Sequence, residues 1–144
     1  MATQHANVKE IVMPPTTDTT TLSSTRIWTG RILSFLPALF LLVDAIMKFI
    51  KPAAVVEATV ALGYPEAVIV PLGAVLLIST LLYLIPRTSV IGAILLTGYL
   101  GGAVATHVRV GAGVFPIVFP IAFGVLIWAG LYLRNQRLQA VILH

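Results

Sequence analysis

Long hydrophobic runs, each about 20 residues in length, alternate with short polar segments over most of the chain. The four runs cover residues 32–50, 67–85, 90–108 and 114–133. Each run is long enough to cross the hydrocarbon core of a bilayer, because about 20 residues of α-helix reach about 30 Å. The apolar residues are consecutive and do not alternate with polar ones, a pattern that favours helices over a membrane β-barrel. The sequence therefore predicts an all-α fold, a membrane four-helix bundle with short loops.

The segments before and after these runs divide the chain into three regions. Residues 1–25 hold a threonine-rich stretch at 16–21 and no apolar run of signal-peptide length. We expect a disordered polar N-terminal tail rather than a cleaved leader, because this segment buries too little apolar surface to offset its conformational entropy. Residues 26–138 are predicted to form the transmembrane domain and residues 139–144 a short C-terminal tail.

The links between the runs indicate how the helices follow one another. Residues 86–89 and 109–113 are short links, which make consecutive helices antiparallel neighbours. The first link, residues 51–66, is longer and combines several alanines and valines with Glu57. We expect it to form a short amphipathic helix at the membrane surface that ends at Gly63-Tyr64-Pro65.

The distribution of Lys and Arg predicts the orientation in the membrane. One side of the predicted bundle receives Arg26, Arg31, Arg87, Arg134 and Arg137. The other side receives Lys48, Lys51 and Arg109, together with Glu57 and Glu66. Because cytoplasmic loops carry the excess of positive charge, we expect a multi-pass protein of the cell (inner) membrane with both termini cytoplasmic.

Composition supports the membrane assignment and argues against several functions. Hydrophobic residues make up 58% of the chain and charged residues 10%, against about 45–50% and about 25% in soluble domains. The net charge of +4 comes from nine Lys and Arg spread along the chain, so we expect no nucleic-acid partner. The chain has no cysteine and three histidines, of which only His107 lies near a predicted span. This set does not suit a zinc site, an iron–sulfur cluster or a membrane haem, so we expect no metal and no covalent cofactor.

Two charged residues inside the first predicted span are the strongest candidates for a functional site. Asp44 and Lys48 are four residues apart, which places them on one helix face in the favourable order for an ion pair. The third predicted span ends on the same side of the membrane with His107 and Arg109. We interpret these four residues as the lining of a small polar ligand pocket beneath the first link. The alternative, which the sequence leaves open, is a structural ion pair whose lysine reaches for the lipid headgroups.

Small residues at helical spacing mark the third predicted span. Gly98 and Gly102 are four residues apart, and so are Gly101 and Ala105 on the adjacent face. Such spacing allows two helix backbones to approach closely in a membrane. We expect these residues to pack against another helix of the same chain, and the alternative is contact with a second copy in a homo-oligomer.

The chain resembles the DoxX family of small four-helix membrane proteins, and specifically its DoxX-like branch. The stretches that carry the resemblance are DAIMK at residues 44–48 followed by Lys51-Pro52, LGYPE at 62–66, LYLIPRT at 82–88, LTGYLGGAVATHVR at 96–109, Phe119-Pro120 and WAGLYLR at 128–134. Together they extend from about residue 32 to about residue 138. The resemblance implies a membrane subunit of a quinone-coupled oxidoreductase system, such as thiosulfate oxidation, or of an oxidative-stress complex. It supplies no catalytic residues, so none is assigned.

Three functions are consistent with these observations. The first is an accessory subunit of a membrane oxidoreductase system that binds a quinone-like or other amphiphilic ligand in the polar pocket and serves a redox partner protein. The second is a small proton-coupled exporter in which Asp44 takes up and releases the proton, although the neighbouring Lys48 would keep that carboxylate ionised. The third is a non-catalytic structural or assembly protein. We favour the first.

Overall fold

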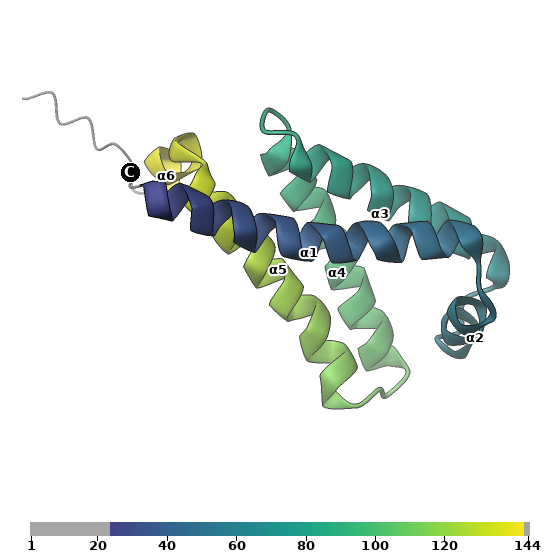
Figure 1. Cartoon of the computed structure of the whole chain (residues 1–144). Helices are drawn as coiled ribbons and strands as arrows, with labels where there is room; N and C mark the ends of the chain where they lie inside the picture. The colour runs from purple at the N-terminus through teal and green to yellow at the C-terminus, as the bar shows by residue number, and fades with distance from the viewer. Residues whose placement is uncertain (1–23, 143–144) are drawn as a thin grey trace, which may run out of the picture.

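The computed structural model describes residues 24–142, which are helical over most of their length (Figure 1). The four long helices are α1 (Ser24–Ile50), α3 (Ile69–Leu84), α4 (Ser89–Arg109) and α5 (Val114–Arg134). The shorter elements are α2 (Ala53–Ala61), the 3-10 helix η1 (Glu66–Val68) and α6 (Gln136–Ile142). The described residues contain no strand, and the predicted all-α fold is confirmed. The predicted N-terminal tail lies outside the described residues, apart from residues 24 and 25.

The long helices form a ring in which α1 and α4 each pack against both α3 and α5. Their shared core is built from aliphatic side chains together with Tyr83, and its largest fully buried members include Leu76, Leu96, Ile127 and Leu131. The turn at residues 85–88 joins α3 to α4 at one end of the bundle, and α6 follows α5 at that same end (Figure 1). We call this the α6 end and the opposite end, where α1 leads into α2, the α2 end.

Two glycines allow close contacts between the helices. A Cβ atom at Gly92 of α4 would lie 2.1 Å from the backbone nitrogen of Tyr83, and a Cβ atom at Gly130 of α5 would lie 2.8 Å from that of Ser34. Any larger residue at either position would force the backbones apart, so these glycines set the spacing of α4 to α3 and of α5 to α1.

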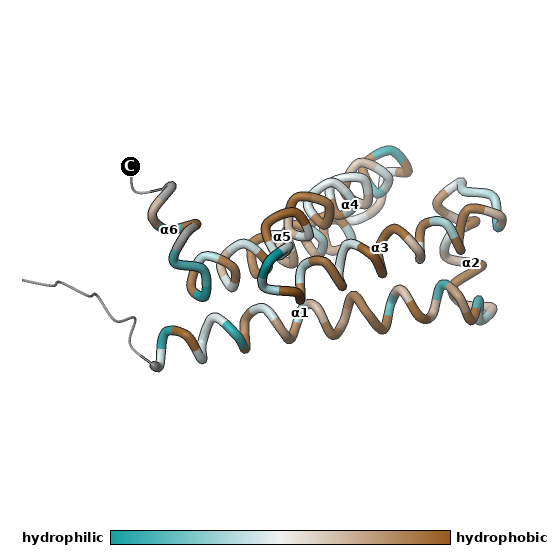
Figure 2. Tube along the Cα trace, turned by 90° about the horizontal axis from the view of Figure 1, so that it is seen from above, coloured by the Kyte–Doolittle hydropathy of each residue, from teal (hydrophilic) through white to brown (hydrophobic). Residues whose placement is uncertain are grey.

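The outer surface of the bundle is apolar, as a lipid environment requires. Side chains such as Phe35, Val75, Ile94 and Val125 are more than half exposed. Figure 2 shows brown hydrophobic stretches along the long helices, with hydrophilic positions gathered near the helix ends. Within the described residues, four helical segments are long and apolar enough to cross a membrane: Thr25–Ile50, Glu66–Leu84, Ser89–Arg109 and Val114–Arg134. The protein is therefore a multi-pass membrane protein.

The ends of the predicted helices differ from the observed ones in three places. Helix α1 begins at Ser24, eight residues before the hydrophobic run, because its first two turns extend the helix beyond the apolar core. Residues 136–142 form α6, where the sequence predicted the end of the bundle and a short tail. The expected helix in the first link is present as α2, but it is not amphipathic, because its apolar side chains surround it and Glu57 is its only charged residue.

Candidate functional site

An ion pair lies inside the membrane-spanning part of α1, near the α2 end. The ammonium nitrogen of Lys48 is 2.6 Å from Oδ1 of Asp44, one helical turn earlier. The Lys48 side chain is 15% exposed and that of Asp44 is 36% exposed. A Cβ atom at Gly73 of α3 would lie 2.8 Å from Cβ of Lys48, so this glycine leaves room for the lysine stem between the two helices.

Helix α4 presents Tyr99 and Thr106 to the same region. They are seven residues apart, which is two helical turns, and therefore lie on one face of α4. The Tyr99 phenol is close enough to Asp44 and to Tyr64 to interact electrostatically with both. No hydrogen bond to the Tyr99 hydroxyl occurs in the part of the chain that the structure describes. Tyr99 thus brings an unused donor and acceptor within electrostatic range of Asp44.

Residues 52–68, which comprise α2, the following loop and η1, form a segment that we call the lid. The Tyr64 hydroxyl is 2.8 Å from Oγ1 of Thr106, which itself donates to the Gly102 carbonyl at 2.9 Å. Because a threonine hydroxyl has one proton, Tyr64 is the donor in its bond to Thr106. The lid is therefore attached to α4 directly above Tyr99.

Two cationic side chains hold the lid at its margins. Arg109 donates to the Leu62 carbonyl at 2.5 Å and lies 6.0 Å from the centre of the Tyr64 ring. Gly63, at φ +83°, turns the chain beside this guanidinium, and a Cβ atom there would lie 3.1 Å from Nη2. At the other margin, Lys51 pairs with Glu66 at 2.7 Å. The lid thus connects the ends of α1 and α4.

The structure gives the four predicted site residues different contacts. Asp44 and Lys48 form the ion pair, as their spacing predicted. Arg109 binds the lid, and the hydrogen bonds and ion pairs of residues 24–142 do not connect it to Asp44 or Lys48. His107 is partly buried, and its Nδ1 atom is buried without a hydrogen-bond partner among the described residues. A common ligand for all four residues stays a prediction.

Sequence reasoning did not identify Tyr64 and Tyr99 as site residues. A tyrosine in an apolar span is readily read as a core or interface residue. The signal was available for Tyr99, because its seven-residue spacing from Thr106 places both hydroxyls on one helix face. Tyr64 carried no such signal, since its position depends on how the lid folds back onto α4.

The small residues of α4 do not act as expected. A Cβ atom at Gly98, Gly101 or Gly102 would meet no other part of the chain within 4 Å, and Ala105 is exposed. The expectation that they pack against another helix of this chain is therefore wrong, because α4 turns a different face, marked by Gly92, toward α3. The alternative, contact with a second copy, stays a prediction.

Three cavities of the described structure lie away from this site. The largest, of about 1070 Å³, is at the α6 end, and one of about 440 Å³ lies beside α1 near Trp28 and Arg134. The third, of about 650 Å³, is an apolar groove between α4 and α5. None of the three is lined by Asp44, Lys48, His107 or Arg109. Described His, Asp and Glu residues form no group of three that could hold a metal ion.

The site at the α2 end combines unused hydrogen-bond donors with an ion pair whose two charges neutralise each other. Lys48 has two N–H groups left after its bond to Asp44, and Tyr99 has a free hydroxyl. Such groups can bind carbonyl or other polar oxygens.

Comparison with known proteins identifies one relationship. The model of the DoxX-like family matches residues 32–130, which include α1 from its third turn, the lid, α3, α4 and most of α5. Neither the curated proteins nor the solved structures contain a significant match to the chain.

Proposed function

The chain belongs to the DoxX-like family, and on that premise we propose that it is a non-catalytic membrane subunit that binds the polar head of a quinone-like amphiphile beneath the lid. The observation that carries this proposal is the Tyr99 hydroxyl of α4, which has no hydrogen bond among the described residues and lies within electrostatic range of Asp44 in the ion pair. In this proposal the protein holds the ligand for a separate redox partner.

The chemistry of the donors fits a ligand with carbonyl oxygens. A quinone head accepts hydrogen bonds and carries no charge, so it suits a site whose two charges already neutralise each other. Lys48 and Tyr99 approach from α1 and α4 and could each donate one hydrogen bond. The buried Nδ1 of His107, one position beyond Thr106, is a further group without a partner in the described structure.

The ligand also needs an apolar surface for its tail. Exposed apolar side chains of the bundle near the α2 end supply one, among them Met47 of α1 and Val108 of α4. A hydrocarbon chain could lie there or among the surrounding lipids. This supports an amphiphile over a water-soluble ligand.

The two other functions have less support. The Asp44 carboxylate is already bound to Lys48 at 2.6 Å, whereas an exporter needs a carboxylate that is available to its substrate. An assembly role is the second candidate, because Gly98, Gly101 and Gly102 leave one face of α4 open to a partner helix.

Titration of the purified full-length protein in detergent or nanodiscs with a short-chain quinone analogue tests the binding proposal. Tyr99→Phe removes one oxygen atom and no hydrogen bond within the protein, and we expect it to weaken binding about two- to tenfold. Tyr132→Phe, near the α6 end of α5, is the matched control and should bind as the wild type does. Equal affinities of all three proteins, or no binding by any, would remove the ligand site beneath the lid.

The subunit role needs a separate test. Gentle solubilisation of native membranes followed by size separation should place the chain in a complex with a flavin- or haem-containing protein, recognised by its absorbance. Migration of the chain without any redox-active partner would favour the assembly role or a function in isolation.

A further inference from the structure

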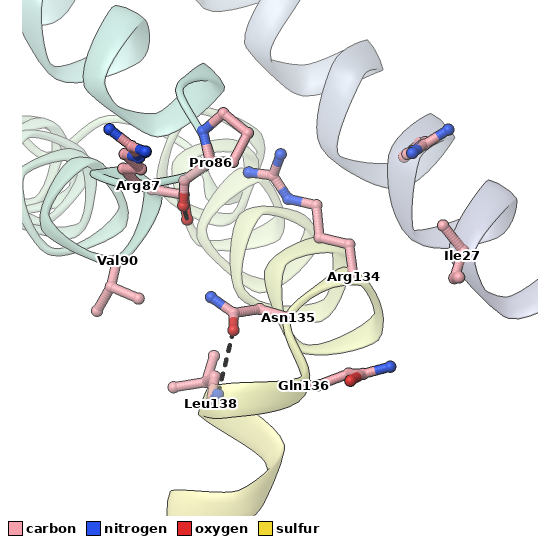
Figure 3. Close-up of a pocket in the computed structure, with 10 residues that line it drawn as sticks. Ile27, Pro86, Arg87, Val90, Arg134, Asn135, Gln136 and Leu138 are labelled. Atoms are coloured by element: carbon pink, nitrogen blue, oxygen red, sulfur yellow. Dashed lines mark hydrogen bonds between the residues drawn. The ribbon is translucent and has the colours of Figure 1, made fainter. Parts of the chain in front are cut away.

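A large cavity of the described structure lies at the α6 end, far from the lid. Its volume is about 1070 Å³. Its walls come from the first turns of α1, the turn between α3 and α4, and the junction between α5 and α6. Figure 3 shows Arg134 extending from α5 toward Pro86 of the turn, with Arg87 on the far side of Pro86. The cavity is thus assembled from three parts of the chain that are distant in sequence.

Three arginines line this cavity: Arg31, Arg87 and Arg134. Arg134 donates to the Tyr83 carbonyl at 2.9 Å and lies 4.8 Å from the centre of the Tyr83 ring, which fixes the guanidinium in place. Its Nε atom is buried without a hydrogen-bond partner among the described residues. Arg31 lies 5.7 Å from the centre of the Trp28 ring, and the structure shows no ion pair for Arg87 within residues 24–142.

No described carboxylate compensates these three charges. The acidic side chains of residues 24–142 are Asp44, Glu57 and Glu66. Asp44 is paired inside α1 near the α2 end, and the two glutamates belong to the lid. Like charges gathered at a membrane surface, where the dielectric constant is lower than in water, attract an anion.

The start of α4 adds to this attraction. Ser89 and Val90, the first two residues of that helix, also line the cavity. The positive end of the helix dipole and the unpaired N–H groups of the first turn therefore face the same space as the arginines. Helix N-termini and the planar donor forks of arginine both suit the oxygens of a phosphate group.

We propose that this cavity binds a phosphate group at the membrane surface, held by Arg31, Arg87 and Arg134. The cavity also has apolar walls, including Ile27, Val90 and Leu138, against which the first carbons of an acyl chain can pack. Basic cavities between transmembrane helices bind the headgroups of anionic lipids in this way. The phosphate could belong to an anionic phospholipid or be free in solution, and the two sources are separated by experiment.

The test uses the full-length protein in nanodiscs of zwitterionic phosphatidylcholine. Phosphatidylglycerol is titrated in one arm and inorganic phosphate in the other, and binding is followed by native mass spectrometry and by the shift in melting temperature. The variant Arg31→Gln/Arg87→Gln leaves Arg134 and its contact with Tyr83 intact. Arg26→Gln is the matched control, because Arg26 lies in the same turns of α1 but does not line the cavity.

We expect phosphatidylglycerol to bind the wild type and Arg26→Gln alike, and to bind the double variant about 30-fold more weakly. Inorganic phosphate binding to the wild type, with phosphatidylglycerol giving no added effect, would identify free phosphate as the ligand and keep the site. The proposal is overturned if neither probe distinguishes the wild type from the double variant. It is also overturned if Arg26→Gln weakens binding as much as the double variant does, since that result indicates surface charge alone.

Discussion

The guanidinium of Arg109, the last residue of α4, donates a hydrogen bond to the Leu62 carbonyl of the lid at 2.5 Å. This contact joins residues 47 positions apart in sequence. Together with the bond between Tyr64 and Thr106 it attaches the lid to α4, whereas Lys51 and Glu66 attach it to the end of α1. Arg109 therefore acts on the position of the lid, and the ligand pocket that it was predicted to share with Asp44, Lys48 and His107 stays a prediction.

Replacing Arg109 is expected to loosen the lid without unfolding the bundle. Arg109→Gln removes the charged donor to Leu62 and the cation–π contact with Tyr64, while α4 itself is unaffected. Hydrogen–deuterium exchange of residues 53–65 should rise about tenfold, in line with the loss of one charge-assisted hydrogen bond. Exchange in α3 and α5 serves as the internal control, and Arg87→Gln as the variant control.

The same exchange experiment can also contradict the proposed role of Arg109 in holding the lid. Unchanged exchange in the lid of Arg109→Gln would mean that Tyr64 and the Lys51–Glu66 pair hold it without Arg109. A rise in exchange throughout the bundle would instead assign Arg109 a role in overall stability.

The ion pair between Asp44 and Lys48 should behave as one unit. Removing either partner leaves the other charge in an apolar span, and we expect each of Asp44→Asn and Lys48→Met to lower the free energy of unfolding by about 2 kcal/mol. The double variant removes both charges and should lose less than the sum of the single changes. The measurement is a double-mutant cycle by chemical unfolding in mild detergent. Additive losses would show that the two side chains do not interact in the membrane.

We expect a glycine-to-alanine substitution to have opposite effects on stability at two different faces of α4. A Cβ atom at Gly92 would lie 2.1 Å from the backbone nitrogen of Tyr83, so Gly92→Ala must displace α4 from α3 and should destabilise the protein by about 3 kcal/mol. Gly98→Ala meets nothing within 4 Å and should stabilise the isolated chain by about 0.5–1 kcal/mol, because alanine favours helix. Thermal unfolding of both variants in the same detergent compares them directly.

The outcome for Gly98→Ala also bears on self-association. A loss of stability at this position, together with a change in oligomeric mass, would indicate that a second copy packs on the open face of α4.

Much of the fold follows from the sequence, because hydrophobic runs of bilayer length carry a strong signal. The core of each long helix, the antiparallel order and the pairing of Asp44 with Lys48 all follow from run length, link length and a spacing of four residues. The sequence could not show in this way which glycine of α4 packs against α3. Gly92 and Gly98 occur in equally apolar surroundings in the sequence, and only the rotation of α4 decides which one contacts α3.

The contacts within the site were harder to predict from the sequence, because they too depend on how the elements are placed in space. Depth in the membrane can be counted along a helix, so Asp44 and Arg109 were placed at the same end. Which side chains meet depends on the path of the lid, which turns at Lys51, with φ +53°, and at Gly63. That path brings Tyr64 to Thr106 and Arg109 to Leu62, contacts that no periodicity in the sequence indicates.

The last prediction concerns Tyr83, whose side chain is fully buried near the α6 end. Its hydroxyl donates to the Ile127 carbonyl of α5 at 2.9 Å, and its ring lies beneath the Arg134 guanidinium. Tyr83→Phe keeps the ring and the cation–π contact but removes the bond that joins α3 to α5. We expect the free energy of unfolding to fall by about 1 kcal/mol, the usual net value of a neutral hydrogen bond, with no change in helix content by circular dichroism. Tyr132→Phe is the matched control, and a loss of the same size in both variants would mean that the bond to Ile127 contributes nothing specific.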